Sequence, residues 1–83
     1  MKRSESAMAR RVGDELVILD VNSGRYFGLN DVGALIWDLL EHDTTRDDLV
    51  DAVLASFDVD RDQAAGDIDD LVTELVDRDL VDR

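Results

Sequence analysis

The run over residues 24–30 constrains the fold of this chain most. It reads Gly-Arg-Tyr-Phe-Gly-Leu-Asn, and an Ile-Trp pair follows it at residues 36–37. Before it, residues 15–21 alternate as a strand does and lead into the turn cluster Asn-Ser-Gly. We therefore predict a hairpin, a short aromatic strand over residues 25–29 and a capped helix directly after it.

Three strands are expected in the first part of the chain, over residues 8–12, 15–21 and 25–29. The second of them has apolar residues at both odd and even positions, so we expect both of its faces to be covered. In the third strand, Phe27 and Leu29 share one face with Arg25, whereas Tyr26 and Gly28 lie on the other face.

Three amphipathic helices should follow the strands, because apolar residues recur there at spacings of three and four. Side chains suited to capping stand before each of them. The expected helices begin at Asn30 or Asp31, at Thr44 or Thr45, and at Asp58 or Asp60; the first ends near Glu41 and the last near Arg78. We expect Trp37 to anchor the core with its indole N–H near the surface, and Leu80-Val81 to close onto the core.

Composition sets limits on function. The 83 residues predict one domain over 1–83, with residues 1–6 loose. No cysteine, secretory signal or long apolar run is present, so we expect a cytoplasmic protein that does not enter the membrane. The net charge is −12, although the first 13 residues carry four basic residues and one acidic residue. Such an acidic body should repel nucleic acid and attract a basic peptide.

Chemistry-bearing motifs are weak. Residues 58–62 with Asp69 imitate a calcium loop, but Gln63 replaces the glycine of the sharp turn and Asp69 replaces the final glutamate. We interpret this segment as a helix cap and an acidic first turn. The single histidine, His42, lies near a helix end and has no second histidine to join in a metal site or relay. We therefore expect no catalytic residue, no metal and no cofactor, and thus not an enzyme.

The third strand and the third helix are the elements that suggest binding. A strand at a sheet edge has unpaired backbone groups, which either an added peptide strand or a shielding loop or charge can cover. The apolar stripe of the third helix is wide, and Asp67, Glu74 and Arg78 border it next to Leu71. Such a stripe serves a core, a peptide groove, or both.

Several short motifs occur together in a specific order, namely Gly24-Arg25-Tyr26-Phe27, Leu29-Asn30, Ile36-Trp37, Leu39-Leu40, Phe57-Asp58-Val59 and Leu80-Val81. In this order they resemble the PqqD-like family, the recognition elements of ribosomal natural-product pathways (RiPP recognition elements). The family is named for the pyrroloquinoline-quinone biosynthesis protein D. The resemblance covers residues 10–82, nearly the whole chain.

This resemblance implies an α+β, winged helix-turn-helix-like fold with a three-stranded antiparallel sheet followed by three helices. It also implies a non-catalytic module that binds the leader segment of a precursor peptide as an added antiparallel strand, against the third helix. The implied peptide-binding residues on the strand are Arg25, Tyr26, Phe27, Gly28 and Leu29. Those on the helix are Asp67, Asp70, Leu71, Glu74, Leu75 and Arg78.

Partners follow from the same resemblance. The Tyr and Trp pattern, with no enzyme domain attached, is most similar to the leader-binding protein of lasso-peptide clusters, which passes the leader to a cysteine-protease-like peptidase before a cyclase acts. The alternative within the family is a peptide chaperone for a radical S-adenosylmethionine enzyme, as in pyrroloquinoline-quinone biosynthesis. The residues do not decide between these two systems.

A winged-helix DNA-binding regulator is the rival class. Residues 61–78 carry six acidic and two basic residues, whereas a recognition helix for DNA should be basic. We therefore expect no nucleic-acid partner. An exposed strand edge also allows weak self-association, so we expect a monomer or a weak dimer.

Overall fold

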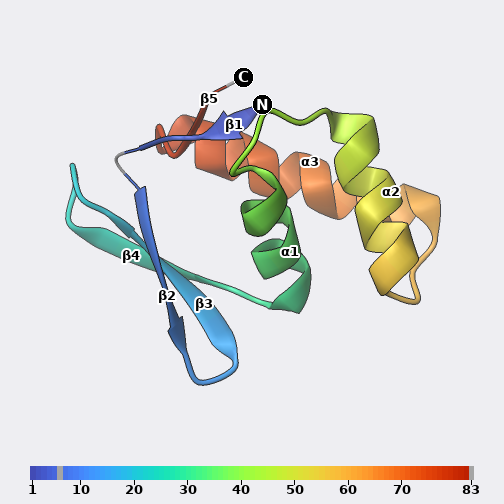
Figure 1. Ribbon diagram of the computed structural model, residues 1–83, viewed down its shortest axis with the longest axis horizontal. Coiled ribbons are helices and arrows are strands. Elements are labelled where there is room, and N and C mark those ends of the chain that lie inside the picture. The colour runs from blue at the N-terminus through green and yellow to red at the C-terminus, as the bar shows by residue number, and fades with distance from the viewer. Residues whose placement is uncertain (6, 83) are drawn as a thin grey trace.

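The computed structural model describes residues 1–5 and 7–82 and has an α+β fold (Figure 1). Its main sheet is antiparallel, in the order β2-β3-β4, and comprises β2 (Ala7–Val12), β3 (Glu15–Asp20) and β4 (Arg25–Leu29). Three helices follow, α1 (Asp31–Leu39), α2 (Arg46–Ser56) and α3 (Arg61–Asp77). Two short strands, β1 (Lys2–Arg3) and β5 (Val81–Asp82), form a separate antiparallel pair. The predicted fold is confirmed, and no helix of the described residues is long and apolar enough to cross a membrane.

A tight turn fixes the register of the β3–β4 hairpin. Gly24 has a φ of +72°, and its N–H donates to the carbonyl oxygen of Asp20 at 2.8 Å. The Asp20 carboxylate accepts further hydrogen bonds, from the backbone N–H of Asn22 at 3.0 Å and the hydroxyl of Ser23 at 2.8 Å. Asp20 consequently pairs with Arg25, which places Arg25, Phe27 and Leu29 of β4 on the same face as the apolar core of β3.

Side-chain caps define where the helices begin, and the structure selects one residue from each predicted pair. A side-chain oxygen accepts a hydrogen bond from the backbone N–H three residues later in each case. These contacts are Asn30 with Gly33 at 3.0 Å, Thr45 with Asp48 at 3.1 Å, and Asp60 with Gln63 at 2.8 Å. The cap at Asp60 agrees with our interpretation of residues 58–62.

The C-terminal end of α3 is closed by a Schellman motif. The N–H of Leu80 donates to the carbonyl oxygen of Leu75 at 2.8 Å, and the N–H of Asp79 donates to that of Val76 at 3.0 Å. Asp79 adopts the left-handed conformation that this motif requires, with a φ of +58°. Leu75 and Leu80 are both fully buried, and so is Val81, so the predicted closure of Leu80-Val81 onto the core is confirmed.

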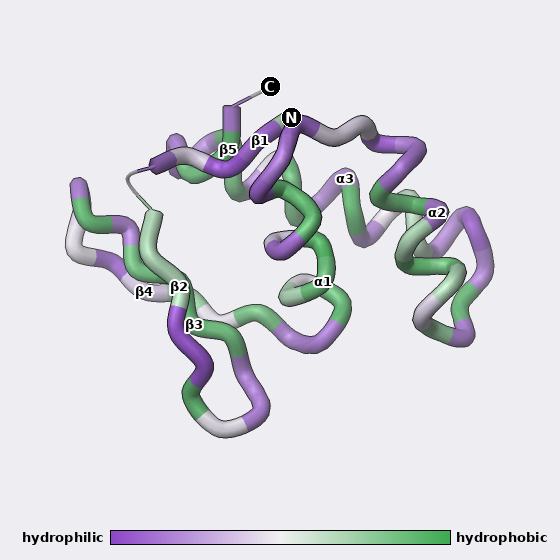
Figure 2. Tube along the Cα trace, in the orientation of Figure 1, coloured by the Kyte–Doolittle hydropathy of each residue, from purple (hydrophilic) through white to green (hydrophobic). Residues whose placement is uncertain are grey.

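The core lies between the inner face of the sheet and the three helices. Its buried side chains include Leu16, Ile18, Leu29, Ile36, Trp37, Leu40, Leu49, Val53, Ile68, Val72 and Leu75. Figure 2 shows α1 as largely hydrophobic along its trace, whereas hydrophilic residues recur along α3. Trp37 is 2% exposed, and its indole nitrogen has no hydrogen-bond partner among the described residues. The expectation of an indole N–H near the surface was therefore wrong, because α1 turns the whole ring inward.

The outer face of the sheet, opposite the core, stays uncovered. Met8 and Tyr26 are 61% and 70% exposed, and with Val17 and Leu19 they line a shallow hollow of about 430 Å³. The expectation that both faces of the second strand are covered was wrong. Helix α1 packs on the inner face, α2 packs on α1 and α3, and α3 also packs on β5, so none of the three helices covers the outer face.

The N-terminal segment is held in place, contrary to the expectation that residues 1–6 are loose. Lys2 and Arg3 pair with Asp82 and Val81, and the N–H of Ser4 donates to the carbonyl oxygen of Leu80 at 2.8 Å. The Arg3 guanidinium stacks 5.4 Å from the centre of the Trp37 ring. Long-range backbone pairing orders residues that have little local propensity; residue 6 lies outside the described residues.

We expect Gly24→Ala to lower the free energy of unfolding by about 1–2 kcal/mol, because an alanine is strained at a φ of +72°. Gly66→Ala is the matched control, since Gly66 lies within α3 with open space around its Cβ position. That change should raise the free energy of unfolding by about 0.5–1 kcal/mol. Urea denaturation of both variants measures the difference, and equal stabilities would contradict the hairpin geometry.

Candidate functional site

Strand β4 forms a free edge of the sheet. It is the last strand in the order β2-β3-β4, and it pairs only with β3 among the described strands. Alternate residues of such a strand direct their N–H and C=O groups away from the sheet. The alternate residues of β4 that face away from β3 therefore present a row of hydrogen-bonding groups to an incoming extended chain.

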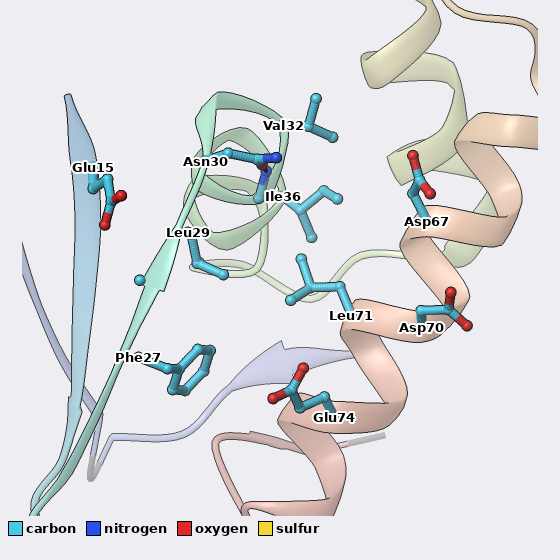
Figure 3. Close-up of a pocket in the computed structure, with 12 residues that line it drawn as sticks. Glu15, Phe27, Leu29, Asn30, Val32, Ile36, Asp67, Asp70, Leu71 and Glu74 are labelled. Atoms are coloured by element: carbon cyan, nitrogen blue, oxygen red, sulfur yellow. Dashed lines mark hydrogen bonds between the residues drawn. The ribbon is translucent and has the colours of Figure 1, made fainter.

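Helix α3 runs beside this edge and is separated from it by a groove. Near α1 the groove forms a hollow of about 630 Å³ (Figure 3). Apolar side chains from three elements line it, namely Phe27 and Leu29 of β4, Val32 and Ile36 of α1, and Leu71 of α3. In Figure 3, Phe27 points from β4 toward α3 and Leu71 points back toward β4. The groove thus has an apolar floor beside a backbone edge.

The other end of the groove lies near the hairpin turn. A second hollow of about 650 Å³ is lined there by Asp20, Ser23, Arg25, Asp70, Thr73, Glu74, Asp77 and Arg78. The Arg78 guanidinium sits 5.1 Å from the centre of the Phe27 ring and donates to Glu74 at 3.1 Å. Because Asp70 and Glu74 line both hollows, the two form one continuous groove along α3.

Acidic residues dominate the rim. Asp67, Asp70, Glu74 and Asp77 follow one another along one side of α3, and Glu15 stands on the strand side. Of these five, only Glu74 has an ion-pair partner among the described residues. The groove therefore combines an apolar floor with a rim of mostly unpaired carboxylates, which suits an apolar ligand that also carries positive charge.

Nine of the eleven predicted site residues line this groove, and the other two side chains do not. Tyr26 points to the outer face of the sheet, so only its backbone belongs to the edge. Leu75 is fully buried in the core, so its assignment to the groove wall was wrong. Leu71 and Leu75 both belong to the wide apolar stripe of α3 and lie one helical turn apart. Leu71 lines the groove, whereas Leu75 packs into the core.

Some groove residues escaped the sequence reasoning. Thr73 and Asp77 lie three residues after Asp70 and Glu74, so helical spacing alone was a sufficient signal for them. The contributions of Val32 and Ile36 had no such signal, because only the packing of α1 beside the sheet brings them to the groove. Among all the residues that the structure describes, those of the groove included, no group of three or more His, Cys, Asp or Glu side chains is arranged to hold a metal ion.

The hairpin end of the groove contains a carboxyl with a shifted pKa. The hydrogen bond from the Ser23 hydroxyl lowers the pKa of Asp20, and the backbone N–H groups of Asn22 and Ser23 lower it further. A carboxyl with a lowered folded-state pKa stabilises the fold above its unfolded value of about 3.9. This contribution is lost as the pH falls through the folded-state pKa.

We expect Ser23→Ala to raise the pKa of Asp20 toward its ordinary value, because the strongest of these hydrogen bonds is removed. Ser23→Thr keeps the hydroxyl and should leave the pKa low. Carbon-13 NMR titration of the Asp20 carboxyl measures both. An unchanged pKa in Ser23→Ala would show that the turn is not held by this contact.

Comparisons with known proteins agree with this architecture. The sequence matches the family described as coenzyme PQQ synthesis protein D (PqqD) over residues 15–81. Among curated proteins, none matches the sequence. The solved structure of TbiB1 in complex with the TbiA(beta) leader peptide is 36% identical with a TM-score of 0.86, covering 99% of this chain and 95% of that one.

A second solved structure, lasso peptide synthetase B1 complexed with the leader peptide, is 29% identical with a TM-score of 0.81. The match covers 95% of this chain and 93% of that one. The family match spans most of the chain, and the similarity to TbiB1 extends from end to end. The resemblance drawn from the sequence motifs is thereby confirmed, and the chain belongs to the PqqD family.

Proposed function

We propose that this protein binds the leader segment of a ribosomally made precursor peptide and presents it to a processing enzyme. The observation that carries the proposal is the free edge of β4 beside the apolar groove of α3. Both solved relatives are complexes with a leader peptide, and the fold matches them over nearly the whole chain. An added strand is a common way in which an open sheet edge recognises a peptide.

The edge of β4 and the groove beside it would contribute differently to recognition of the leader. Backbone hydrogen bonds to β4 give affinity for any extended chain, and pockets for alternate side chains give specificity. Alternate side chains of an added strand would enter the space between Phe27 and Leu71. Most of the binding energy should therefore come from one or two apolar anchors of the leader.

The proposed role is recognition without a chemical step. Holding the leader raises the concentration of its attached core peptide near an enzyme that binds this protein. We propose a leader peptidase of the lasso-peptide type as that enzyme, because one solved relative is a lasso peptide synthetase component. A radical S-adenosylmethionine enzyme is the second candidate, favoured by the match to the coenzyme PQQ synthesis family.

The outer face of the sheet supports the presenting role. Met8, Val12 and Tyr26 are exposed there, on the side of the sheet opposite the core. A peptide added to the edge of β4 would leave this apolar face free. Exposed apolar patches of this kind commonly mark contact surfaces for other proteins.

Strand addition predicts a specific pattern of amide protection. The outward-facing N–H groups of β4 should exchange rapidly in the free protein and slowly with the leader bound, while those that face β3 change little. Hydrogen-exchange NMR with the leader encoded beside this protein's gene measures the pattern. If the leader bound without protecting alternate amides of β4, strand addition at this edge would be wrong.

We expect Leu71→Asp to weaken leader binding about ten-fold or more, because it places a charge on the apolar floor of the groove. Leu54→Asp is the matched control, since Leu54 is similarly half-buried but lies on α2, outside the groove. Fluorescence anisotropy measures affinity, and circular dichroism checks that both variants remain folded. Equal affinities for the two variants would contradict the groove assignment.

Tyr26→Ser should leave binding of the leader unchanged but impair presentation of the leader to the processing enzyme. The substitution changes the outer face and leaves the backbone edge intact, so leader affinity should stay within about two-fold. Cleavage of the leader by the proposed partner peptidase should slow in the presence of the variant, because the apolar face is weakened. Unchanged cleavage would mean that the enzyme docks elsewhere.

A further inference from the structure

Charge is distributed unevenly along the groove. The hollow near α1 is lined by Glu15, Asp67, Asp70 and Glu74, and by no basic residue of the described chain. The hollow near the hairpin contains Asp20, Asp70, Glu74 and Asp77 together with Arg25 and Arg78. The α1 end is therefore more strongly negative than the hairpin end.

Arg78 sharpens this difference. Its guanidinium donates to Glu74 at 3.1 Å and stacks on Phe27, so it offsets the charge of Glu74 and makes the rim less negative on the hairpin side of the apolar floor. Asp67 has no such partner among the described residues. In Figure 3, Glu74 lies at the level of Phe27, whereas Asp67 lies one turn farther along α3 than Leu71, across the hollow from Val32 and Ile36.

The direction of an added strand determines which end of the peptide lies at the more negative end of the groove, and so which peptide sequences are preferred. The sheet is antiparallel throughout, so a fourth strand that continues the pattern runs opposite to β4. Its N-terminal end then lies near Leu29 and Asp67, and its C-terminal end lies near Arg25 and Arg78. Basic residues of the peptide would meet the end of the groove that has carboxylates and no basic residue only if they precede the apolar anchor in sequence.

The spacing can be worked out from the geometry of the two elements. Asp67 precedes Leu71 by one turn of α3, an axial rise of about 6 Å. Two residues of an antiparallel strand advance by about 6.8 Å and project to the same side. A side chain two positions before an anchor that contacts Leu71 would thus stand beside Asp67.

From this geometry we infer that the charge of the groove determines on which side of its apolar anchor a bound peptide carries its basic residue. The groove selects a segment in which a lysine or arginine lies about two residues N-terminal to an apolar anchor. Asp67 is the residue that determines this preference, and Arg78 disfavours a basic side chain on the C-terminal side of the anchor. The inference rests on the proposed function and specifies the chemistry of its ligand.

The test uses the leader encoded beside this protein's gene as a fluorescent probe, at low and at high salt. Three forms are compared: the native leader, one with the basic residues before its apolar anchor replaced by glutamate, and one with those residues moved behind the anchor. Both altered forms should bind about five-fold or more weakly at low salt, and added salt should reduce the difference.

Variants of the protein provide the matched control. Asp67→Asn and Asp77→Asn change the net charge equally, but they lie at opposite ends of the groove. Asp67→Asn should weaken binding of the native leader about two- to five-fold, and Asp77→Asn should change it less. Asp67→Lys should recover part of the affinity for the glutamate-substituted leader.

The outcomes separate the two levels of the proposal. The preference for a basic residue before the anchor would be wrong if Asp67→Asn and Asp77→Asn had equal effects, or if moving the basic residues left binding unchanged. Neither result would contradict leader binding itself. A native leader without a basic residue before its anchor, bound tightly, would also overturn this preference. No binding of the leader at any salt concentration would contradict the proposed function and, with it, this inference.

Discussion

Packing of α1 against the sheet holds the groove open. The buried side chains of α1, among them Ile36 and Trp37, belong to the same core as Leu16 and Ile18 of β3. Helix α3 packs chiefly against α2 and β5 rather than against the sheet. The edge of β4 and the side of α3 thus face each other across a space that neither fills. Burial of each large apolar side chain contributes about 1.5–3 kcal/mol. This spacing is therefore held chiefly by the core, and less by the contact of Arg78 with Phe27 across the groove.

Three kinds of interaction meet in that space and differ in what they supply. Backbone hydrogen bonds at β4 are independent of sequence, and the apolar floor around Phe27 and Leu71 supplies most of the affinity. The carboxylates along α3 are exposed, so each contributes modestly and is screened by salt. Their number, and the presence of basic residues beside them at the hairpin end alone, make them suited to setting direction and association rate rather than strength.

Sequence reasoning succeeded where the signal was local. The bounds of β4 follow from residues adjacent in the chain, and the structure confirms them. The same local signal narrowed each helix cap to two candidates, of which the structure selects Asn30, Thr45 and Asp60. Sequence reasoning failed where the answer depended on distant segments, as with the pairing of β1 and β5 and the open outer face of β3. The division of the α3 stripe between core and groove, which buries Leu75 and leaves Leu71 accessible, likewise requires the packed structure.

The β1–β5 pair connects parts of the molecule that the groove depends on. Backbone hydrogen bonds from Arg3 to Leu40 and from Ser4 to Leu80 tie the N-terminal segment to the ends of α1 and α3. This segment lines neither hollow of the groove, yet it fixes the position of the helix that forms one wall. A change in the first few residues would therefore shift the position of α3 and adjust groove width, and so peptide preference, while every residue that lines the groove stays the same.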